Sequence, residues 1–251
     1  MIAPNQTGPF DIIGDVHGCY PELVELLNEL GYEITWEKEK VQAISHPQKR
    51  RLIFVGDFVD RGPDSPAVLK LVMRLMELQI AFAVIGNHDD KLMRKLSGRN
   101  VQINHGLDIT LAQMENEPKL FHNQVRDFLE ALPYYLWFDN YNLLIAHAGL
   151  PEKYHGEKSK RIRELTLFGP TTGKLDEYGL PMRIQWAKEY KGKPYVVFGH
   201  TPVREPLFLN NTVNIDTGCV FGGKLTALQY PEIKTVSVPC KEMYAEPRRP
   251  F

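Results

Sequence analysis

The chain has 251 residues, 43% of them hydrophobic, a formal net charge of −1 at pH 7 and a pI near 6.7. This length is typical of one large α/β domain, and the balanced charge excludes the strongly basic surface that sequence-independent nucleic-acid binding requires. No apolar run approaches the roughly 18 residues of a membrane span, and residues 1–9 lack the apolar core of a signal peptide. We expect a cytoplasmic protein with one domain over residues 1–251, surface tails at 1–9 and about 240–251, and no membrane partner. The oligomeric state stays open.

The three cysteines, Cys19, Cys219 and Cys240, are too few and oddly numbered for a disulfide framework. Two of them lie beside glycines of the motifs described below. We therefore expect small, buried, reduced thiols that serve packing.

The first half of the chain alternates short apolar runs with amphipathic segments. Expected strands lie at Phe10–Ile13, Tyr32–Trp36, Val41–Ser45, Leu52–Val55 and Phe82–Ile85. Expected helices begin at about Pro21 and Ser65, and others cover Asp89–Leu96, Gly106–Glu115 and Leu120–Leu132. This β-α-β order favours a parallel or mixed sheet, whose ligands gather at the carboxyl ends of the strands.

From Tyr134 onward the pattern changes to strands, with a tight turn expected at Asn210-Asn211. The expected strands are Tyr134–Phe138, Leu143–Ala146, Tyr195–Phe198, Leu207–Leu209, Val213–Ile215, Leu225–Gln229 and Thr235–Val238. Between Gly149 and Lys193 lies a long polar segment, which we expect to be a functional loop without regular structure. The expected fold is α/β, with two facing mixed sheets.

Five apolar runs end in a polar side chain beside a glycine. The central one is Gly56-Asp57-Phe58-Val59-Asp60-Arg61-Gly62, and the others are Gly14-Asp15-Val16-His17-Gly18, Gly86-Asn87-His88-Asp89, His147-Ala148-Gly149 and Gly199-His200-Thr201. Buried charges are costly unless they are paired or bind metal. A single such residue is most often structural, but five strand ends with the same device indicate a metal site.

The candidate ligands offer carboxylate, amide and imidazole groups but no thiolate: Asp15, His17, Asp57, Asn87, His147 and His200. Such a set suits Mn²⁺ or Fe²⁺, with Zn²⁺, Ni²⁺ and Co²⁺ as rivals, and disfavours an iron–sulfur or cysteine-type zinc site. Six ligands are too many for one tetrahedral ion but suit two ions that share a carboxylate. Two ions about 3.5–4 Å apart can activate water and clamp both oxygens of a phosphoryl displacement.

These motifs, GDVHG, GDFVDRG, GNHD, HAG and GHT, resemble those of the phosphoprotein-phosphatase family of metallophosphoesterases. The chain is most similar to two bacterial branches, the stand-alone dinucleoside tetraphosphatases and the phosphatase module of polynucleotide kinase-phosphatases. Three segments carry this closer likeness: Leu167–Gly173, Asp176–Pro181 and Asn214–Gly223. The resemblance implies a calcineurin-like metallophosphoesterase fold, with two facing mixed β-sheets flanked by helices.

By this resemblance, Asp15 and His17 bind the first metal, Asp57 bridges, and Asn87, His147 and His200 bind the second. His88 is the general acid, oriented by Asp60, since a carboxylate partner fixes an imidazole tautomer. Arg61 holds the phosphate oxygens of the substrate through its planar fork.

Other residues keep two interpretations. Asp216 is an active-site carboxylate in the similar branches, either a substrate contact or a support for the ligands. Arg183 is a candidate for the second phosphate-binding arginine, or a surface arginine packed on Trp186. The basic stretch Lys158–Arg163 is either a solvated face or a polyphosphate-attracting surface.

The leading hypothesis is an enzyme that hydrolyses phosphate esters or anhydrides of small nucleotide-type substrates, above all an asymmetrical bis(5′-nucleosyl)-tetraphosphatase. The alternatives are a phosphoprotein phosphatase, a nucleic-acid end phosphatase or 2′,3′-cyclic phosphodiesterase, and a non-catalytic phosphate-binding protein. The last is disfavoured because every expected ligand, His88 and Arg61 are present.

Overall fold

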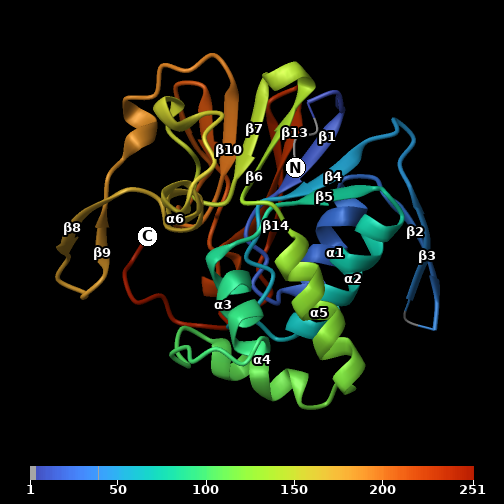
Figure 1. The fold of residues 1–251 in the computed structure, drawn as a ribbon. Helices are drawn as coiled ribbons and strands as arrows, with labels where there is room; N and C mark the ends of the chain where they lie inside the picture. Colours follow the sequence, from blue (N-terminus) through green and yellow to red (C-terminus); the bar gives the residue numbers. More distant parts are fainter. Residues whose placement is uncertain (1–3, 39) are drawn as a thin grey trace.

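Two open sheets organise the chain in the computed structural model, which describes residues 4–38 and 40–251 (Figure 1). The helices are α1 (Tyr20–Glu29), α2 (Ser65–Glu77), α3 (Asn87–Leu96), α4 (Leu107–Met114), α5 (Lys119–Ala131) and α6 (Lys160–Phe168). Short 3₁₀ turns are η1 (Asp139–Tyr141), η2 (Glu152–Tyr154), η3 (Trp186–Lys188) and η4 (Cys219–Phe221). Within the described residues, no helix is long and apolar enough to cross a bilayer.

The first sheet has the strand order β14-β13-β1-β4-β5. Its strands are β1 (Phe10–Ile13), β4 (Arg51–Phe54), β5 (Ala81–Ala83), β13 (Lys224–Tyr230) and β14 (Lys234–Pro239). Strands β1, β4 and β5 are parallel, whereas β13 runs antiparallel to β1. The carboxyl ends of the three parallel strands therefore share one edge.

The second sheet has the order β11-β12-β10-β7-β6. Its strands are β6 (Tyr135–Phe138), β7 (Leu143–Ala146), β10 (Tyr195–Phe198), β11 (Leu207–Leu209) and β12 (Thr212–Asn214). Strands β7, β10 and β12 are parallel, and β11 pairs antiparallel with β12 across the expected Asn210-Asn211 turn. Two hairpins form separate two-stranded sheets: β2 (Glu33–Glu37) pairs with β3 (Lys40–Ser45), and β8 (Thr171–Leu175) pairs with β9 (Pro181–Arg183).

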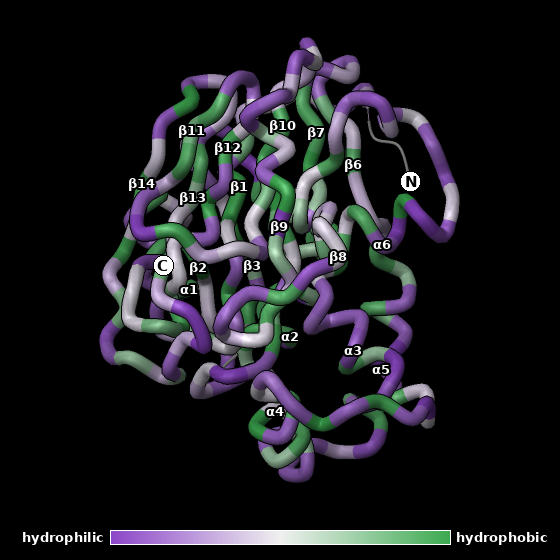
Figure 2. The backbone as a smooth tube through the Cα atoms, turned by 90° about the vertical axis from the view of Figure 1, so that its left-hand side faces the viewer, coloured by the Kyte–Doolittle hydropathy of each residue, from purple (hydrophilic) through white to green (hydrophobic). Residues whose placement is uncertain are grey.

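The sheets face each other across a buried apolar layer. Both contribute to it: Phe10, Ile12 and Ile53 come from the first sheet, and Ile145 and Val197 from the second. Helices α1 and α2 pack on the outer face of the first sheet, and α6 places Ile162 against the outer side of the second. In Figure 2 the central strands are largely green, and the long connections around them are mostly purple. The predicted calcineurin-like architecture with two facing mixed sheets is confirmed.

Local signals explain where the helices begin. The Asp64 carboxylate accepts a hydrogen bond from the Ala67 amide and caps α2, which has Pro66 in its first turn. Ser159 caps α6 in the same way, through the Ile162 amide. Both caps satisfy amides that the first turn of a helix leaves without an internal partner.

The structure corrects the expectation for the segment from Gly149 to Lys193. This segment is no structureless loop, because it contains α6 and the β8–β9 hairpin. The sequence hides both elements: α6 has only nine residues, and all five residues of β8 are exposed. Neither element therefore shows the apolar periodicity on which a sequence-based prediction depends.

The two expected tails are also tied to the rest of the molecule. The carbonyl groups of Pro4 and Gln6 accept hydrogen bonds from Asn140 and Asp139, whereas residues 1–3 of the expected first tail lie outside the described residues. Glu39, between β2 and β3, also lies outside the described residues. The last residues run past α3 toward the β8–β9 hairpin (Figure 1).

Candidate active site

The polar residues that follow the parallel strands of both sheets lie close together in space. Asp15, Asp57 and Asn87 follow β1, β4 and β5, and His147 and His200 follow β7 and β10. The ligand atoms of His17, Asp57 and His88 lie within 4.8 Å of one another, as do those of Asp57, His147 and His200. Asp57 belongs to both groups, which is the arrangement that a bridging carboxylate requires.

The hydrogen bonds of His17 and His147 orient their rings toward Asp57. Nδ1 of His17 lies 2.8 Å from the Val59 carbonyl oxygen, and Nδ1 of His147 lies 3.1 Å from that of Val55. A carbonyl only accepts, so Nδ1 of each ring carries a proton, which leaves Nε2 to bind a cation once that nitrogen is deprotonated. These Nε2 atoms lie 3.6 and 3.3 Å from Oδ2 of Asp57. Lone pairs that face a carboxylate across a buried gap fit a cation between them.

Asn87 and His200 complete the group around His147. Nε2 of His147 lies 3.0 Å from Oδ1 of Asn87 and 3.1 Å from Nδ1 of His200. Nε2 of His200 is buried and has no hydrogen-bond partner among residues 4–38 and 40–251. Asp15 lies beside this group without joining it, and its carboxylate accepts a hydrogen bond from the His200 amide at 3.0 Å.

The buried carboxylates of the site repel one another. Burial and the neighbouring Asp216 raise the pKa of Asp15 well above its usual range, and burial raises the pKa of Asp216 to about 6. Burial also opposes ionisation of Asp57, but the imidazoles of His147 and His88 hold its pKa well below the usual range. Burial disfavours a charged His147 ring, yet Asp57 outweighs this effect and raises the His147 pKa to about 9. The site thus favours added positive charge, which divalent ions provide.

The backbone around the site is strained at several non-glycine residues. Positive φ angles occur at His17 (45°), Asp57 (53°), Asp60 (77°), Arg61 (72°) and His200 (72°). Such conformations cost about 1–3 kcal/mol each and cluster at functional sites. They turn the chain sharply after β1, β4 and β10 and direct the side chains into a common space.

Gly86 shows why the motifs need a glycine at this edge. A Cβ atom at Gly86 would lie 2.1 Å from Oδ1 of Asp57 and 2.3 Å from its backbone nitrogen. The missing side chain lets the β5 end approach the central loop. Asp89 supports the same loop, because its carboxylate accepts hydrogen bonds from the amides of Asp57, Phe58 and Gly86.

The His88 ring lies between the Asp60 carboxylate and the Arg61 guanidinium. Its Nδ1 lies 2.6 Å from Oδ2 of Asp60, and the Thr110 hydroxyl donates to Oδ1 of Asp60 at 2.7 Å. Nε2 of His88 lies 2.9 Å from Nη2 of Arg61. The guanidinium of Arg61 also lies 5.2 Å from the centre of the Phe221 ring. The ring of His88 is therefore held by Asp60, with Nε2 directed toward the group that Arg61 would bind.

A cleft of about 940 Å³ opens above these residues. Its lining includes Asp216 and six basic side chains: Arg61, Lys91, Arg94, Arg183, Arg248 and Arg249. Nη1 of Arg183 is buried and has no hydrogen-bond partner in the described part of the chain. Arg183 thus lies in the cleft, as one of its two sequence-based interpretations requires.

The basic stretch Lys158–Arg163 does not line this cleft. It covers the start of α6, where Arg163 forms a short ion pair with Asp90, and Arg161 donates to the Tyr154 hydroxyl at 2.6 Å. Arg161 and Arg163 are therefore engaged in local contacts, and the stretch lies outside the cleft that a polyphosphate would enter.

A family model of the calcineurin-like phosphoesterases matches residues 8–238. The chain belongs to this family. It is therefore a metal-dependent phosphoesterase, and the predicted family and enzyme class are confirmed.

Several named relatives share nearly the whole chain. The asymmetrical bis(5′-nucleosyl)-tetraphosphatase PrpE of Anoxybacillus flavithermus is 47% identical over 247 residues, which are 96% of this chain and 99% of the relative. The protein of the same name from Oceanobacillus iheyensis is 46% identical over 238 residues, 93% of each chain.

Solved structures agree with this family. A crystal structure of a diadenosine tetraphosphatase candidate has a TM-score of 0.68 and 30% identity, covering 95% of this chain and 96% of that one. A serine/threonine phosphatase from Saccharomyces cerevisiae has a TM-score of 0.63 at 16% identity and covers 96% of this chain and 83% of its own. The second likeness shows a shared fold only.

Several residues that line the cleft were not predicted from the sequence. Lys91 and Arg94 follow His88 at helical spacing along α3, a signal that could have placed them near the site. Arg248 and Arg249 carry no such signal, because only the path of the last residues brings them there. Thr110 lies in α4, 50 residues from its partner Asp60.

Proposed function

We propose that the chain hydrolyses dinucleoside tetraphosphates asymmetrically, so that diadenosine tetraphosphate yields ATP and AMP. The names of relatives that are 46–47% identical over almost the full length support this substrate. The observation that carries the proposal is the row of arginines beyond Arg61, which suits a long anionic chain rather than a single phosphate.

The proposed metal ligands fit two divalent ions. Asp15 and His17 would hold the first, Asn87, His147 and His200 the second, and Asp57 both. Oxygen and imidazole donors without thiolate favour Mn²⁺, with Fe²⁺, Ni²⁺, Co²⁺ and Zn²⁺ as alternatives. When bound, such ions activate a water molecule and neutralise charge on the reacting phosphoryl group.

The side chains of the protein would perform the remaining tasks. Arg61 would hold two oxygens of the reacting phosphate through its fork. His88 would donate a proton from Nε2 to the departing oxygen, while Asp60 keeps the proton on Nδ1 and the ring in place. Asp216, buried at the cleft wall, would support the ligands from behind rather than bind an anionic substrate.

Arg183 is our candidate for the second phosphate-binding arginine. Burial and the neighbouring Arg249 lower the pKa of Arg183, and its buried Nη1 has no partner among the described residues. An unpaired guanidinium nitrogen at a cleft wall is stabilised by an anion. Arg183 and Arg248 would hold the triphosphate that leaves, together with Arg249 once its ion pair with Asp176 at 3.0 Å opens, which favours cleavage next to the first phosphate.

We also propose that residues 1–251 act as one domain on a small-molecule substrate in the cytoplasm. The free thiols and a nucleotide substrate fit a reducing compartment. Fractionation of cells that express the protein would test this location, and recovery in an oxidising compartment would contradict it.

Chromatography of the early products of diadenosine tetraphosphate with Mn²⁺ tests the function. Equal amounts of ATP and AMP are expected, and ADP as the sole product would contradict the asymmetric assignment. A phosphopeptide and a 2′,3′-cyclic nucleotide serve as competing substrates. Faster turnover of either one would reassign the enzyme to the corresponding alternative.

A further inference from the structure

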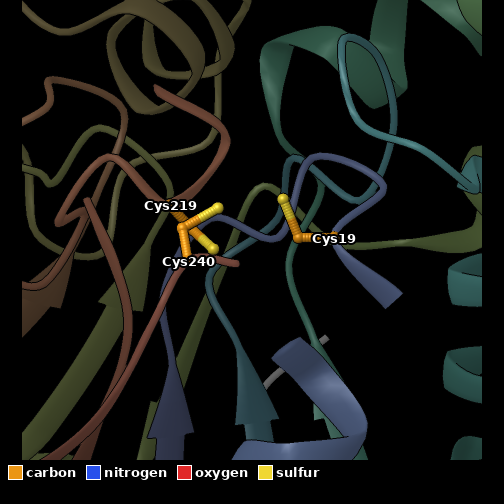
Figure 3. A group of neighbouring side chains, drawn as sticks. All are labelled: Cys19, Cys219 and Cys240. Carbon is orange, nitrogen blue, oxygen red and sulfur yellow. The ribbon is translucent and has the colours of Figure 1, made fainter. Parts of the chain in front are cut away.

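The three cysteines meet in space although they are far apart in the sequence. Their Sγ atoms lie within 4.8 Å of one another, and we call Cys19, Cys219 and Cys240 the thiol cluster. Figure 3 shows Cys219 and Cys240 close together, with Cys19 facing them from the loop before α1. Cys19 and Cys219 are buried, Cys240 is half-buried, and all three are free thiols. The expectation of small, buried, free thiols holds for Cys19 and Cys219, but it did not include the convergence of the three cysteines.

The spacing of the thiol cluster is close to that of a tetrahedral metal site. Thiolates that share one zinc ion, at a Zn–S distance of about 2.3 Å, lie about 3.8 Å apart. Other partners of these thiols are few: Cys19 is 3.8 Å from the His17 carbonyl oxygen, and Cys240 donates to the Glu242 carbonyl at 2.9 Å. Since thiols are weak hydrogen-bond donors, these contacts explain little of the convergence.

A buried carboxylate beside the thiol cluster is a second and independent observation. Glu22 is 0% exposed, and its Oε1 accepts hydrogen bonds from the Lys241 amide and the Tyr244 hydroxyl, both at 3.0 Å. The same Oε1 lies 3.8 Å from Sγ of Cys240. Oε2 of Glu22 is buried and has no hydrogen-bond partner within residues 4–38 and 40–251.

The nearby lysine does not neutralise Glu22. Nζ of Lys241 points to Glu25, at 3.6 Å from its carboxylate. A buried carboxylate with one unpaired oxygen is costly unless a cation lies near it. The thiol cluster and Glu22 therefore both favour a cation at the same place.

We propose that the thiol cluster is a structural zinc site, separate from the two-metal centre. Cys19, Cys219 and Cys240 bind the ion as thiolates, and their protons pass to the buffer without any change of oxidation state. Glu22, whose Oε1 lies 3.8 Å from Sγ of Cys240, supplies the fourth ligand from the α1 side. Soft thiolate donors select zinc over the harder ions that suit the oxygen-rich active site.

The position of the thiol cluster gives this ion a mechanical role. Cys19 lies two residues after His17, and Cys219 begins the η4 turn that carries Phe221 into the cleft. Cys240 lies where the chain leaves β14 toward the cleft arginines Arg248 and Arg249. A bound ion would fasten the last residues to the loop behind the active site.

Cobalt binding tests the proposal without reference to activity. The reduced full-length protein is stripped of metal with a chelator and titrated with Co²⁺. Cobalt bound to thiolate shows sulfur-to-metal charge-transfer absorption in the near ultraviolet, whereas the active-site ligands contain no sulfur. We expect the intensity of this absorption at saturation to correspond to one thiolate-bound cobalt per chain, and we expect the absorption to disappear when Zn²⁺ is added.

Variants assign the absorption to the thiol cluster. Cys240→Ser changes the most exposed of the three thiols, and we expect it to remove most of the charge-transfer band. Glu22→Gln keeps the thiolates and should retain the band with at least about tenfold weaker binding, the size of a lost interaction of about 1.4 kcal/mol. Asp57→Asn is the matched control, because it alters the two-metal centre and should leave the band unchanged.

Wild-type protein provides a test that does not depend on the folding of any variant. Zinc should slow alkylation of all three thiols and should raise the melting temperature by about 5–10 °C at saturating concentration. It should also slow cleavage by trypsin after Lys241. Absence of the cobalt–thiolate band in protein with three titratable thiols would overturn the proposal. Ready formation of a disulfide within the thiol cluster, together with no metal protection, would replace it with a redox role.

Discussion

Nδ1 of His88 lies 2.6 Å from Oδ2 of Asp60, and both side chains are buried beneath the cleft. Thr110 holds the other oxygen of Asp60, and Arg61 faces the opposite nitrogen of His88. Arg61 donates to Nε2 in this arrangement, so the ring would deliver a proton from Nε2 only after Arg61 has turned to a bound phosphate and Nε2 has gained a proton. This geometry makes the role of His88 testable by the choice of substrate.

His88→Ala should slow hydrolysis of substrates with basic leaving groups by about 10²–10⁴-fold, the usual range for general acid catalysis. The loss should be much smaller for p-nitrophenyl phosphate, whose leaving group scarcely needs a proton. Comparison of kcat for both substrates measures the effect. Equal losses on both substrates would indicate that His88 positions the phosphate instead.

Thr110→Val should reduce kcat for the tetraphosphate by up to about 10–100-fold, because it removes a charge-assisted hydrogen bond worth about 1.5–3 kcal/mol from the Asp60 carboxylate. Thr110 touches no reacting group and acts by positioning. The discriminating measurement compares KM with kcat: kcat should fall while KM stays constant. Asp60→Asn should act in the same direction as His88→Ala, but more weakly. A rise in KM for Thr110→Val would point to a general disturbance of the cleft.

Removal of metal should abolish activity, and added Mn²⁺ should restore it. Asp57→Asn should lose activity that Mn²⁺ does not rescue, since Asp57 lies in both groups of candidate ligands. Metal content by mass spectrometry and a circular dichroism spectrum would show loss of ions with retention of the fold. Full turnover by chelated protein would refute the two-metal mechanism.

Arg248→Met and Arg249→Met should raise the KM for diadenosine tetraphosphate by about tenfold or more, as expected for a charge-assisted hydrogen bond of about 1.5–3 kcal/mol. Because p-nitrophenyl phosphate has no distal phosphates, its KM should change little. Arg161→Met is the matched control from the basic stretch outside the cleft and should leave both values unchanged. If the two substrates respond equally, these arginines do not hold distal phosphates.

Asp11→Ala should destabilise the fold far from the active site. The Asp11 carboxylate accepts hydrogen bonds from Nε of Arg50 and the Tyr32 hydroxyl, both at 2.8 Å, and both charged side chains are almost fully buried. Loss of one partner of a buried ion pair costs about 3–5 kcal/mol. We expect a loss near the lower end of this range, because Arg50 keeps an ion pair with Glu232 at 3.0 Å. Urea unfolding measures this loss.

The surface pair of Arg74 and Glu77 is the control for Asp11→Ala. Its removal by Glu77→Ala should change the free energy of unfolding by only about 0–1 kcal/mol, since exposed ion pairs contribute little. Similar losses of unfolding free energy in both variants would mean that burial does not increase the contribution of the Asp11–Arg50 pair to stability.

The sequence determined the strand ends and the chemistry that they carry. Short apolar runs predicted the boundaries of the strands in both sheets to within one or two residues, and the order of the motifs at the strand ends identified the family. These features are local, because a few adjacent residues determine a buried strand and the turn that follows it. The roles of the individual site residues remain proposals.

Only the tertiary structure brought together residues that share no local pattern. Cys19 meets Cys219 and Cys240, and Thr110 reaches Asp60, because the sheet order places distant segments side by side. The direction of the last residues across the cleft and the short elements α6, β8 and β9 were likewise decided there. Exposed or short segments have little apolar periodicity of their own, so the surfaces against which they pack determine their positions.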